Sequence, residues 1–286
     1  MKNNEIYNLI DRDFIKNILT EDAPSGDITS DIILADSEAR AYIICKENCI
    51  LCGIEIVKSI FSYLDEEIII NNKFFDGDTI YKGNIIFELS GNCRSILRGE
   101  RIALNLLSYL SGISTNTSKY VEITKKYDVK LLDTRKTLPM YRNLAKYAVR
   151  IGGGNNHRFN LSDMILIKDN HILISGGIER CLDSFNNKRN LFSFARIEIE
   201  VQNIDEAILA SKYSPDIIML DNFSVSDAKN AINILKDKVK IEISGNINLT
   251  NIEEYAKLKP DYISVGSITH SVKSIDFSLD IEKILN

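Results

Sequence analysis

The sequence predicts an α/β protein whose second half forms a barrel of six parallel strands. Short runs rich in Ile, Leu and Val alternate with helical stretches from residue 128 onward; the runs are DVKLLDT, MILIKDN, FARIEIEV, DIIMLDN, VKIEISG and DYISVGS. A strand followed by a helix, repeated with short connections, is typical of right-handed βαβ units. Six such units favour a closed or nearly closed barrel. An open doubly wound sheet is the alternative, and no G-x-G-x-x-G fingerprint supports it.

The first half reads as a separate, strand-rich α+β unit of about one hundred residues. Its expected elements are a helix over 6–19, a loop over 21–31, a strand over 39–47, a helix over 53–64, a short strand between the turns at 76–77 and 82–83, and a further strand over 84–91. A helix from 95 to 110 follows. Ser111-Gly112 is predicted to interrupt it before a second helix that ends near residue 126.

Composition limits the class of protein. The chain has 286 residues, a formal net charge of −5, 44% hydrophobic and 26% charged residues, which is typical of a globular protein. The acidic balance argues against nucleic acid as the main partner. No apolar run reaches the length of a membrane span, and residues 1–5 lack the apolar core of a signal peptide. Five cysteines, an odd number, favour a reducing cytoplasm.

Three of the cysteines lie close together in sequence. Cys45, Cys49 and Cys52 form a C-x3-C-x2-C pattern, which raises the possibility of a structural metal site. No fourth Cys or His lies nearby to complete a tetrahedral set. Buried thiols in a strand and turn are the favoured interpretation.

Cations gather in one stretch of this acidic chain, residues 133–171. The stretch contains Arg135, Lys136, Arg142, Lys146, Arg150, Arg158 and Lys168, together with His157 and His171. Such a local excess indicates a small anionic ligand. The run Gly152-Gly153-Gly154 adds backbone N–H groups that could face an oxyanion. Arg142, Lys146 and Arg150 lie at helical spacing, so a solvated basic helix explains them equally well.

Groups that can do chemistry stand at the ends of the six predicted strands. They are Asp133 through Lys136, Lys168, Glu200, Asp221, Ser244 with Gly245, and Ser264 with Gly266. Because the C-terminal ends of barrel strands face the active site, this placement indicates function rather than packing.

One strand carries a charged row that should point into the barrel. Ile197, Ile199 and Val201 share one face of ARIEIEV, while Arg196, Glu198 and Glu200 share the other. Helices cover the outer face of such a strand, so the apolar row lies outside and the charged row inside. Glu242 and Lys168 are expected in the same interior network, and a purely structural ion network remains an alternative.

These residue types suit a site for two anionic ligands. Glycine-rich turns late in a barrel commonly hold a phosphate. Carboxylates facing that phosphate are explained if Mg²⁺ lies between them, because hard oxygen ligands suit this ion. The arginine, histidine and lysine cluster then requires an anion of its own, and guanidinium geometry favours a carboxylate. The residues alone do not fix the reaction.

The ordered motifs DTRKTLP, KYAVRIGGGNNHR, LIKDNHI, EIEV, MLDN, EISG and SVGSITHS closely resemble the quinolinate phosphoribosyltransferase family. GDITSDI near the start and GERIALNLLSYLSGIST before the barrel extend the resemblance over nearly the whole chain. It implies a type II phosphoribosyltransferase, with an N-terminal α/β sandwich domain over 1–112, joined by the tail 271–286, and an α/β barrel over 113–270. The implied reaction is that of a pentosyltransferase: phosphoribosyl transfer from phosphoribosyl pyrophosphate (PRPP) to quinolinate, giving nicotinate mononucleotide, pyrophosphate and CO₂ in NAD synthesis.

The resemblance also assigns roles to residues. It implies that Arg135, His157, Arg158 and Lys168 bind the quinolinate carboxylates, with Arg101 reaching in from the second subunit of a homodimer. Lys136 and Lys168 would face the reacting centre and the pyrophosphate, beside Thr134. Glu200 and Asp221 would hold Mg²⁺ and PRPP. The turns Ser244-Gly245-Asn246 and Gly266-Ser267-Ile268 would hold the ribose 5-phosphate.

The sequence departs from the family pattern at two glycines. TLPMYR stands where TTPGLR is usual, so Met140 replaces a glycine, and SGN replaces SGG, which places Asn246 beside the expected phosphate. Three alternatives remain: a molybdate-associated paralogous family, which lacks the IKDNH motif present here, a non-catalytic anion-binding protein, and a Schiff-base aldolase that uses Lys168.

Overall fold

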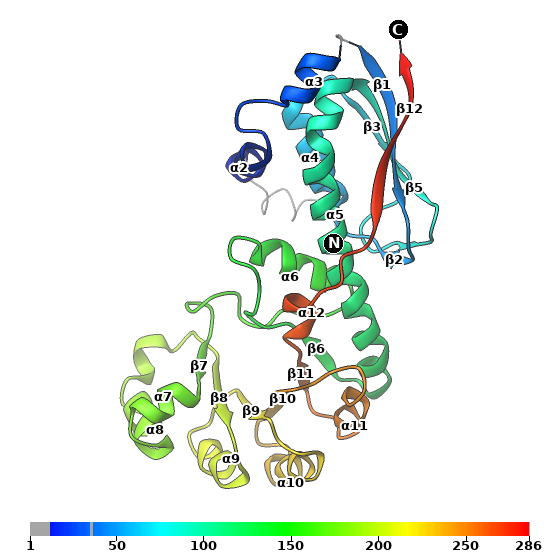
Figure 1. The fold of residues 1–286 in the computed structure, drawn as a ribbon. Helices are drawn as coiled ribbons and strands as arrows, with labels where there is room; N and C mark the ends of the chain where they lie inside the picture. The colour runs from blue at the N-terminus through cyan, green and yellow to red at the C-terminus, as the bar shows by residue number, and fades with distance from the viewer. Residues whose placement is uncertain (1–11, 35–36, 286) are drawn as a thin grey trace. The chain divides into compact units, whose positions relative to one another are not determined.

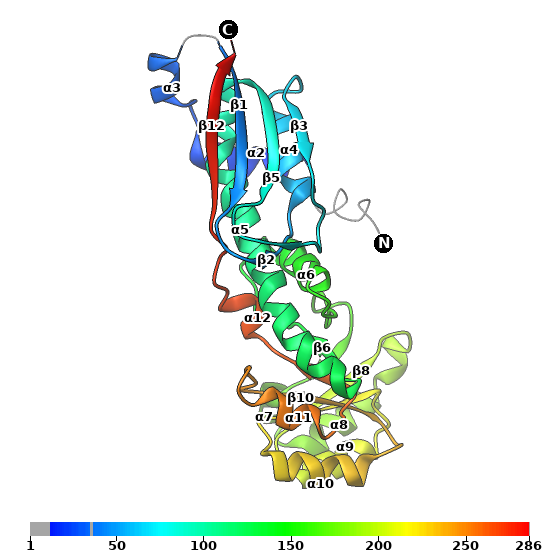
Figure 2. The ribbon, with the colours of Figure 1, turned by 90° about the vertical axis from the view of Figure 1, so that its right-hand side faces the viewer.

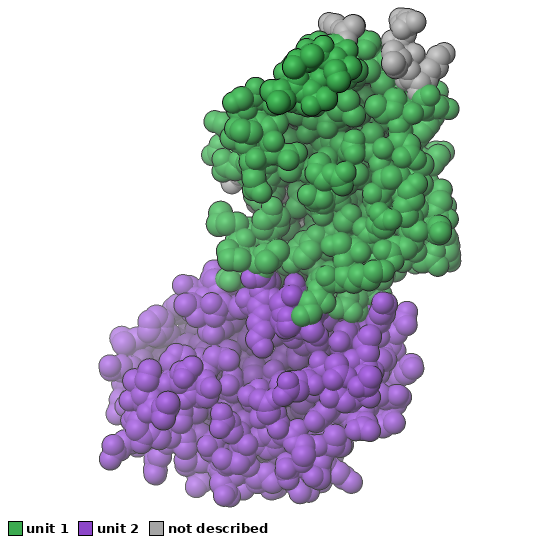
Figure 3. All heavy atoms as spheres, viewed as in Figure 1, with its two compact units in different colours: residues 1–118, 138–153, 271–286 green, residues 119–137, 154–270 purple. Residues whose placement is uncertain are grey.

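The structure, a computed structural model, describes residues 12–34 and 37–285, so the first part of the helix expected over 6–19 lies outside the described residues. Contacts divide the chain into two compact units (Figure 3): 1–118 with 138–153 and 271–286, and 119–137 with 154–270. This grouping places 113–118 and 138–153 in the first unit. The domain boundary expected at 112 and 113 stays a prediction.

The first unit contains an antiparallel sheet in the order β12-β1-β5-β3. Its strands are β1 (Glu38–Cys45), β3 (Ile69–Asn72), β5 (Ile85–Asn92) and β12 (Phe277–Leu285), and a separate pair is formed by β2 (Cys49–Ile50) and β4 (Thr79–Ile80). Burial alternates along β1, whose Ala39, Ala41 and Ile43 are fully buried, so one face of the sheet covers the core. The strands predicted over 39–47 and 84–91 are confirmed.

Helices lie against one face of this sheet (Figure 2). The helices of the first unit are α2 (Arg12–Asp22), α3 (Ile28–Ile33), α4 (Ile54–Leu64) and α6 (Arg142–Ile151), and α5 (Cys93–Thr124) continues from the first unit into the second. The helix predicted over 53–64 is confirmed by α4. The loop predicted over 21–31 is wrong at both ends. Helix α2 includes residues 21 and 22, and the chain is helical again from residue 28, because Asp27 caps α3 by accepting the backbone N–H groups of Thr29 and Ser30.

Helix α5 runs without a break through Ser111 and Gly112, so the interruption predicted there is wrong. The Ser111 hydroxyl bonds to the backbone of Cys52, accepting from its N–H at 3.0 Å. A Cβ on Gly112 would lie 2.5 Å from the carbonyl oxygen of Lys273. The glycine therefore permits close packing rather than ending the helix, and tertiary contacts outweigh its low helix propensity.

The three clustered cysteines are buried in the first unit. Cys45 and Cys49 lie with their sulfur atoms 3.7 Å apart, and the Cys45 thiol donates to the carbonyl oxygen of Glu47. Cys52 is fully buried. All five cysteines of the chain are free thiols.

The second unit contains a parallel sheet in the order β6-β11-β10-β9-β8-β7. The strands are β6 (Lys130–Leu132), β7 (Ile165–Ile167), β8 (Ile197–Val201), β9 (Ile217–Asp221), β10 (Lys240–Ser244) and β11 (Tyr262–Ser264). Each predicted apolar run contains one of these strands. β6 and β7 are the two edges of the sheet, yet Arg135, which follows β6, and Lys168, which follows β7, line one cavity, so the six strands form a nearly closed barrel, as predicted.

Helices follow the strands in the barrel unit, and Figure 1 shows α8 to α11 on the outer side of the strands. These helices are α7 (Asp169–Ile174), α8 (Ile178–Asn186), α9 (Ile204–Ser211), α10 (Val225–Leu235), α11 (Ile252–Ala256) and α12 (Ser267–His270), with short 3-10 turns at Lys125–Tyr127 and Arg189–Phe192. None of the helices in the described part of the chain is both long and apolar enough to cross a bilayer.

Strand β8 confirms the predicted two-faced pattern with one exception. All five residues from Ile197 to Val201 are buried. Glu200 lines the same cavity as Glu242 of β10, and Glu198 lies 3.0 Å from His157, so the charged row faces the inside of the barrel. Arg196 is exposed and precedes the strand, so its predicted place in the interior row is wrong. Its carbonyl oxygen instead accepts the N–H of Ile165, where β7 begins.

Candidate active site

A pocket of about 870 Å³ lies at the C-terminal ends of the barrel strands, and all of its lining residues belong to the second unit. It brings together most of the residues predicted for the site: Thr134, Arg135, Lys136, His157, Arg158, Lys168, Glu200, Asp221, Ser244, Gly245, Asn246, Gly266 and Ser267. Cations and carboxylates thus share one cavity, in the place where barrel folds hold their active sites.

Hydrogen bonds to Asp133 join two of the predicted motifs, DTRKTLP and KYAVRIGGGNNHR. This residue ends the DVKLLD run and is fully buried. Its carboxylate accepts the N–H of His157 at 2.8 Å and the side-chain amide of Asn156 at 2.7 Å. Residues 155–157 are thereby fixed beside β6, and this explains why a buried carboxylate stands between the strand and the TRKT turn.

The Lys136 side chain passes directly over Gly266. A Cβ on Gly266 would lie 2.9 Å from Cδ of Lys136. The backbone of Lys136 is held on both sides, because its N–H donates to the Thr134 hydroxyl and its carbonyl oxygen accepts from Thr269. The absence of a side chain at 266 therefore sets the path of the lysine into the pocket.

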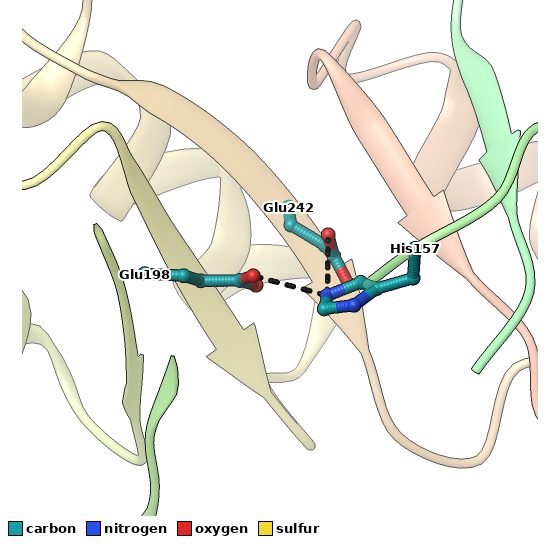
Figure 4. A group of neighbouring side chains, drawn as sticks. All are labelled: His157, Glu198 and Glu242. Atoms are coloured by element: carbon teal, nitrogen blue, oxygen red, sulfur yellow. Dashed lines mark ion pairs between the residues drawn. The ribbon is translucent and has the colours of Figure 1, made fainter. Parts of the chain in front are cut away.

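His157 lies between two buried carboxylates, one from each of two barrel strands (Figure 4). Its Nε2 is 3.0 Å from Oε2 of Glu198 on β8 and 3.8 Å from Oε2 of Glu242 on β10. Both glutamates are 0% exposed. Burial, followed by the nearby Glu198, raises the pKa of Glu242 to about 8, while His157 opposes this shift.

These three residues could hold a metal ion by distance, since their ligand atoms lie within 4.8 Å of one another. The hydrogen bonding of the imidazole argues against it. Nδ1 of His157 accepts the N–H of Arg158 at 2.7 Å, so the ring proton is assigned to Nε2, which faces the carboxylates. A metal would need the Nε2 lone pair, so the arrangement is better explained by electrostatic attraction between the Nε2 side of the ring and the Glu198 carboxylate 3.0 Å away.

Arg135 and Arg158 form the most cationic part of the pocket. Nε of Arg135 is buried and has no hydrogen-bond partner within the described chain. Arg158 is 8% exposed and donates from Nη1 to the carbonyl oxygen of Met164 at 3.1 Å. Burial, and next the neighbouring Arg135, lower the pKa of Arg158. An unpartnered buried donor beside a second guanidinium is the arrangement that an anionic ligand would complete.

Lys168, Glu200 and Asp221 stand at the ends of neighbouring strands. Nζ of Lys168 lies 2.8 Å from Oε2 of Glu200, and Nδ1 of His171 accepts the backbone N–H of Lys168. Burial raises the pKa of Glu200; Lys168 opposes this shift and Asp221 adds to it. Two carboxylates near enough to influence each other offer the hard oxygen donors that Mg²⁺ prefers, so the donor set fits that ion.

The two turns predicted to bind phosphate differ in which of their residues line the pocket. Gly245 and Asn246 both have positive φ angles, of 92° and 52°, and both line the pocket. Gly266 and Ser267 also line it. Ile268 is fully buried, so only its backbone could reach a ligand.

Several residues of the cationic stretch belong to the first unit instead. Arg142, Lys146 and Arg150 lie on α6, and Lys146 is 2% exposed, so a fully solvated helix does not describe it. Gly152 permits close packing, because its Cβ would lie 2.5 Å from the carbonyl oxygen of Ser114. The glycine run does not line the pocket, and its predicted oxyanion role is not supported.

Arg101 also belongs to the first unit, on α5. Its side chain is 64% exposed, and Nη2 lies 3.7 Å from Oε1 of Glu100.

Sequence reasoning missed pocket-lining residues that the structure adds: Asp169, Asn222, Asn248 and His270. Asn222 directly follows Asp221 at the end of β9. Chemically active residues at the ends of strands were selected from the sequence. Extending that selection by one residue would have included Asn222.

A nearly closed six-stranded α/β barrel with a cationic pocket at its C-terminal strand ends defines a class of anion-binding barrel proteins. Comparison with known families is specific within that class. The model for "Quinolinate phosphoribosyl transferase, C-terminal domain" matches residues 113–280, and the model for the N-terminal domain matches residues 27–111. The chain therefore belongs to the quinolinate phosphoribosyl transferase family.

Individual relatives are similar to this chain over almost its full length. The probable nicotinate-nucleotide pyrophosphorylase [carboxylating] of Methanocaldococcus jannaschii is 45% identical, covering 93% of this chain and 95% of that protein. The protein of the same name from Bacillus subtilis is 39% identical, covering 93% of this chain and 92% of that protein. A solved structure of the nicotinate-nucleotide pyrophosphorylase from Francisella tularensis is 42% identical with a TM-score of 0.90, covering 99% of this chain and 98% of that one.

Proposed function

We propose that this protein transfers the phosphoribosyl group of PRPP to the ring nitrogen of quinolinate, with release of pyrophosphate and CO₂, and so forms nicotinate mononucleotide for NAD synthesis. The names of its relatives support this pentosyltransferase reaction. The observation that carries it is the unpartnered buried Nε of Arg135 beside Arg158, in a pocket that also contains Glu200 and Asp221.

Quinolinate would occupy the cationic side of the pocket. Arg135 and Arg158 offer guanidinium groups to its two carboxylates, and Lys168 adds a third positive charge. His157 would lie beside the ligand, its ring placed by the N–H of Arg158, which Nδ1 accepts, and by Glu198, 3.0 Å from Nε2. Binding would give Nε of Arg135 the hydrogen-bond partner that it lacks among the described residues.

PRPP would occupy the side formed by strands β8 to β11. Glu200 and Asp221 are the proposed ligands of Mg²⁺, which when bound to PRPP neutralises the pyrophosphate leaving group. Lys136, whose backbone N–H donates to the Thr134 hydroxyl, would contact the same pyrophosphate group. The turns Ser244-Gly245-Asn246 and Gly266-Ser267-Ile268 would hold the 5-phosphate, the second of them through backbone groups at Ile268.

The chemistry follows from the charges in the pocket. The bond between ribose C1 and the pyrophosphate oxygen breaks, and the electron pair leaves with pyrophosphate, so positive charge develops on C1. Glu200 and Asp221 stabilise that charge. The quinolinate nitrogen then bonds to C1 and becomes cationic. The bond from ring C2 to its carboxylate breaks next, the ring accepts the electron pair, CO₂ leaves, and a proton adds at C2.

A homodimer in which Arg101 completes the partner's site is part of the proposal. Support comes from exposed apolar side chains in each unit. Ile28, Ile32 and Ile33 on α3 are 71–83% exposed. In the second unit, Leu173, Ile174 and Phe194 are 76–86% exposed. Exposed apolar residues that gather on one element, as the three isoleucines of α3 do, are typical of protein–protein interfaces. A cytoplasmic location is proposed as well, and five free thiols support it.

Subunit mixing tests the shared site. Arg101→Ala and Lys136→Ala should each be inactive, and mixing the two proteins under conditions that exchange subunits should restore part of the activity, because one site in each mixed dimer would be intact. No restoration after confirmed exchange would place Arg101 in its own subunit's site or outside the site. Mixing either variant with itself is the control.

A single assay tests the reaction. Purified protein supplied with Mg²⁺, PRPP and quinolinate should form nicotinate mononucleotide and release CO₂, and nicotinate should not replace quinolinate. Product from nicotinate would indicate a different phosphoribosyltransferase. Binding of quinolinate without any turnover would favour a non-catalytic anion-binding protein.

A further inference from the structure

Two asparagine side chains connect the proposed phosphate turn to the Asp221 carboxylate. Nδ2 of Asn222 donates to Oδ2 of Asp221 at 2.8 Å. Oδ1 of Asn222 accepts from Nδ2 of Asn246 at 2.9 Å. The three side chains therefore form one chain of hydrogen bonds, which runs from the turn after β10 to the end of β9.

The middle residue of this chain is held firmly in place. Asn222 has a φ of 57°, and its N–H donates to the carbonyl oxygen of Ser244 at 2.9 Å. Its side chain lies against Gly245, where a Cβ would come within 2.3 Å of Oδ1. Asparagine tolerates the left-handed conformation better than most residues, and its short amide can reach both neighbours.

The direction of the amide group matters. A carboxylate accepts hydrogen bonds, so the NH₂ end of Asn222 must face Asp221. Asn246 secures this orientation because its own NH₂ group donates to the other end of the Asn222 amide. If the amide turned over, its carbonyl oxygen would face the carboxylate and repel it. With one oxygen of Asp221 engaged by Asn222, the carboxylate is fixed in orientation before any cation arrives.

We propose that Asn222 is a positioning residue for the Asp221 carboxylate and that Asn246 orients Asn222, so that the phosphate turn and the cation-binding carboxylate act as one unit. This inference rests on the proposed function. It concerns only residues at the mouth of the barrel. It also gives a use to Asn246, one of the two positions where the sequence departs from the pattern that it resembles.

A double-mutant cycle tests the proposal. Asn222→Gly and Asn246→Gly each remove an amide without adding strain, because glycine accepts positive φ. The two single variants and the double variant are compared with wild type for the KM of PRPP, the KM of quinolinate, and calorimetric binding of PRPP in the presence of Mg²⁺. Gln202→Ala is the matched control, because Gln202 is an exposed amide one residue after β8 that does not line the pocket. Thermal unfolding confirms that each variant is folded.

Asn222→Gly should raise the KM of PRPP and weaken its Mg²⁺-dependent binding roughly tenfold, as expected for the loss of one hydrogen bond to a charged group. The KM of quinolinate should stay within about twofold. Asn246→Gly should have a smaller effect of about threefold, and none in the Asn222→Gly background. Gln202→Ala should match wild type.

Other results would overturn the proposal. If Asn246→Gly had the same effect with and without Asn222, its amide would contact the phosphate directly and would not act through Asn222. Equal changes in both KM values would indicate general damage to the pocket. PRPP binding is measured separately from turnover. A wild-type protein that binds PRPP but forms no nucleotide would therefore reject the proposed reaction, while the binding data of the double-mutant cycle would still test the role of Asn222. A wild-type protein that does not bind PRPP would reject both.

Discussion

The ammonium group of Lys168 lies 2.8 Å from Oε2 of Glu200, so a half-exposed cation covers an almost fully buried carboxylate. Their positions follow from the sheet, since Ile167 of β7 is in register with Ile199 of β8 and each charged residue comes one position later. Burial raises the pKa of Glu200, and Lys168 opposes that shift. The lysine thus offsets part of the cost of burying this carboxylate beside the place where positive charge is proposed to develop.

Replacing Lys168 with Met should lower both activity and stability, because methionine keeps much of the aliphatic stem but removes the charge. We expect kcat to fall roughly 100-fold and the free energy of unfolding to fall by about 1 kcal/mol, since the lysine is partly solvated. Steady-state kinetics and urea unfolding measure these effects. The control is Lys168→Met combined with Glu200→Gln, which removes both charges. It should regain stability without regaining activity, and an equal loss of stability in both proteins would contradict the pairing.

Gly266→Ala should impair catalysis with little effect on folding. The added Cβ would lie 2.9 Å from Cδ of Lys136, and the end of a flexible side chain can move away at low cost. We expect kcat to fall about tenfold because the ammonium group is displaced by roughly 1 Å, while the free energy of unfolding changes by less than about 0.5 kcal/mol. Because Lys136→Ala is itself expected to be inactive, the coupling is read from calorimetric binding of PRPP in the presence of Mg²⁺: Gly266→Ala should weaken this binding in the wild-type background and have no further effect in the Lys136→Ala background. A further loss there would mean that Gly266 acts on another group.

The parts of the fold that could be predicted are those set by local patterns. Apolar runs flanked by helices located all six barrel strands, and the stretch over 39–47 located β1. The errors arise where distant residues decide. Gly112 stays helical because the backbone of Lys273 approaches it closely, and residues 28–33 become helical through the Asp27 cap. No short window of sequence shows that the backbone at 273 lies near 112.

The candidate site was predictable for a related reason. A parallel barrel places the ends of all its strands at one mouth, so residues far apart in sequence, such as Arg135 and Asp221, could be assigned to one pocket. The hydrogen bonds between them could not. The link from Asp133 to His157 and the link from Asn246 to Asn222 depend on loop conformations that strand patterns do not encode.

Glu242→Gln should change how stability depends on pH. The pKa of Glu242 is raised from 4.5 to about 8, chiefly by burial and then by Glu198. Between these values the folded protein holds a proton that the unfolded chain has released, so rising pH favours unfolding. The variant lacks this proton and should lose less stability from pH 6 to pH 8.5, with a difference on the order of 2 kcal/mol.

Urea unfolding at several pH values measures this difference. Glu254→Gln, which alters an exposed glutamate on α11, is the matched control and should follow the wild-type curve. The groups that face Glu242 are His157, Glu198, Glu200 and Ser264. If Glu242→Gln followed the wild-type curve as well, another member of this group would hold the proton.

Met140→Gly should stabilise the protein. Met140 has a φ of 65° and is 85% exposed, so its side chain has little packing to offset a strained backbone. Glycine removes the left-handed strain, worth roughly 1–2 kcal/mol, but adds freedom to the unfolded chain. The expected net gain is about 0.5 kcal/mol in the free energy of unfolding. Leu138→Gly is the matched control, because Leu138 is also exposed yet does not share the positive φ, and glycine there should destabilise. Equal destabilisation by both substitutions would show that the Met140 backbone is not strained.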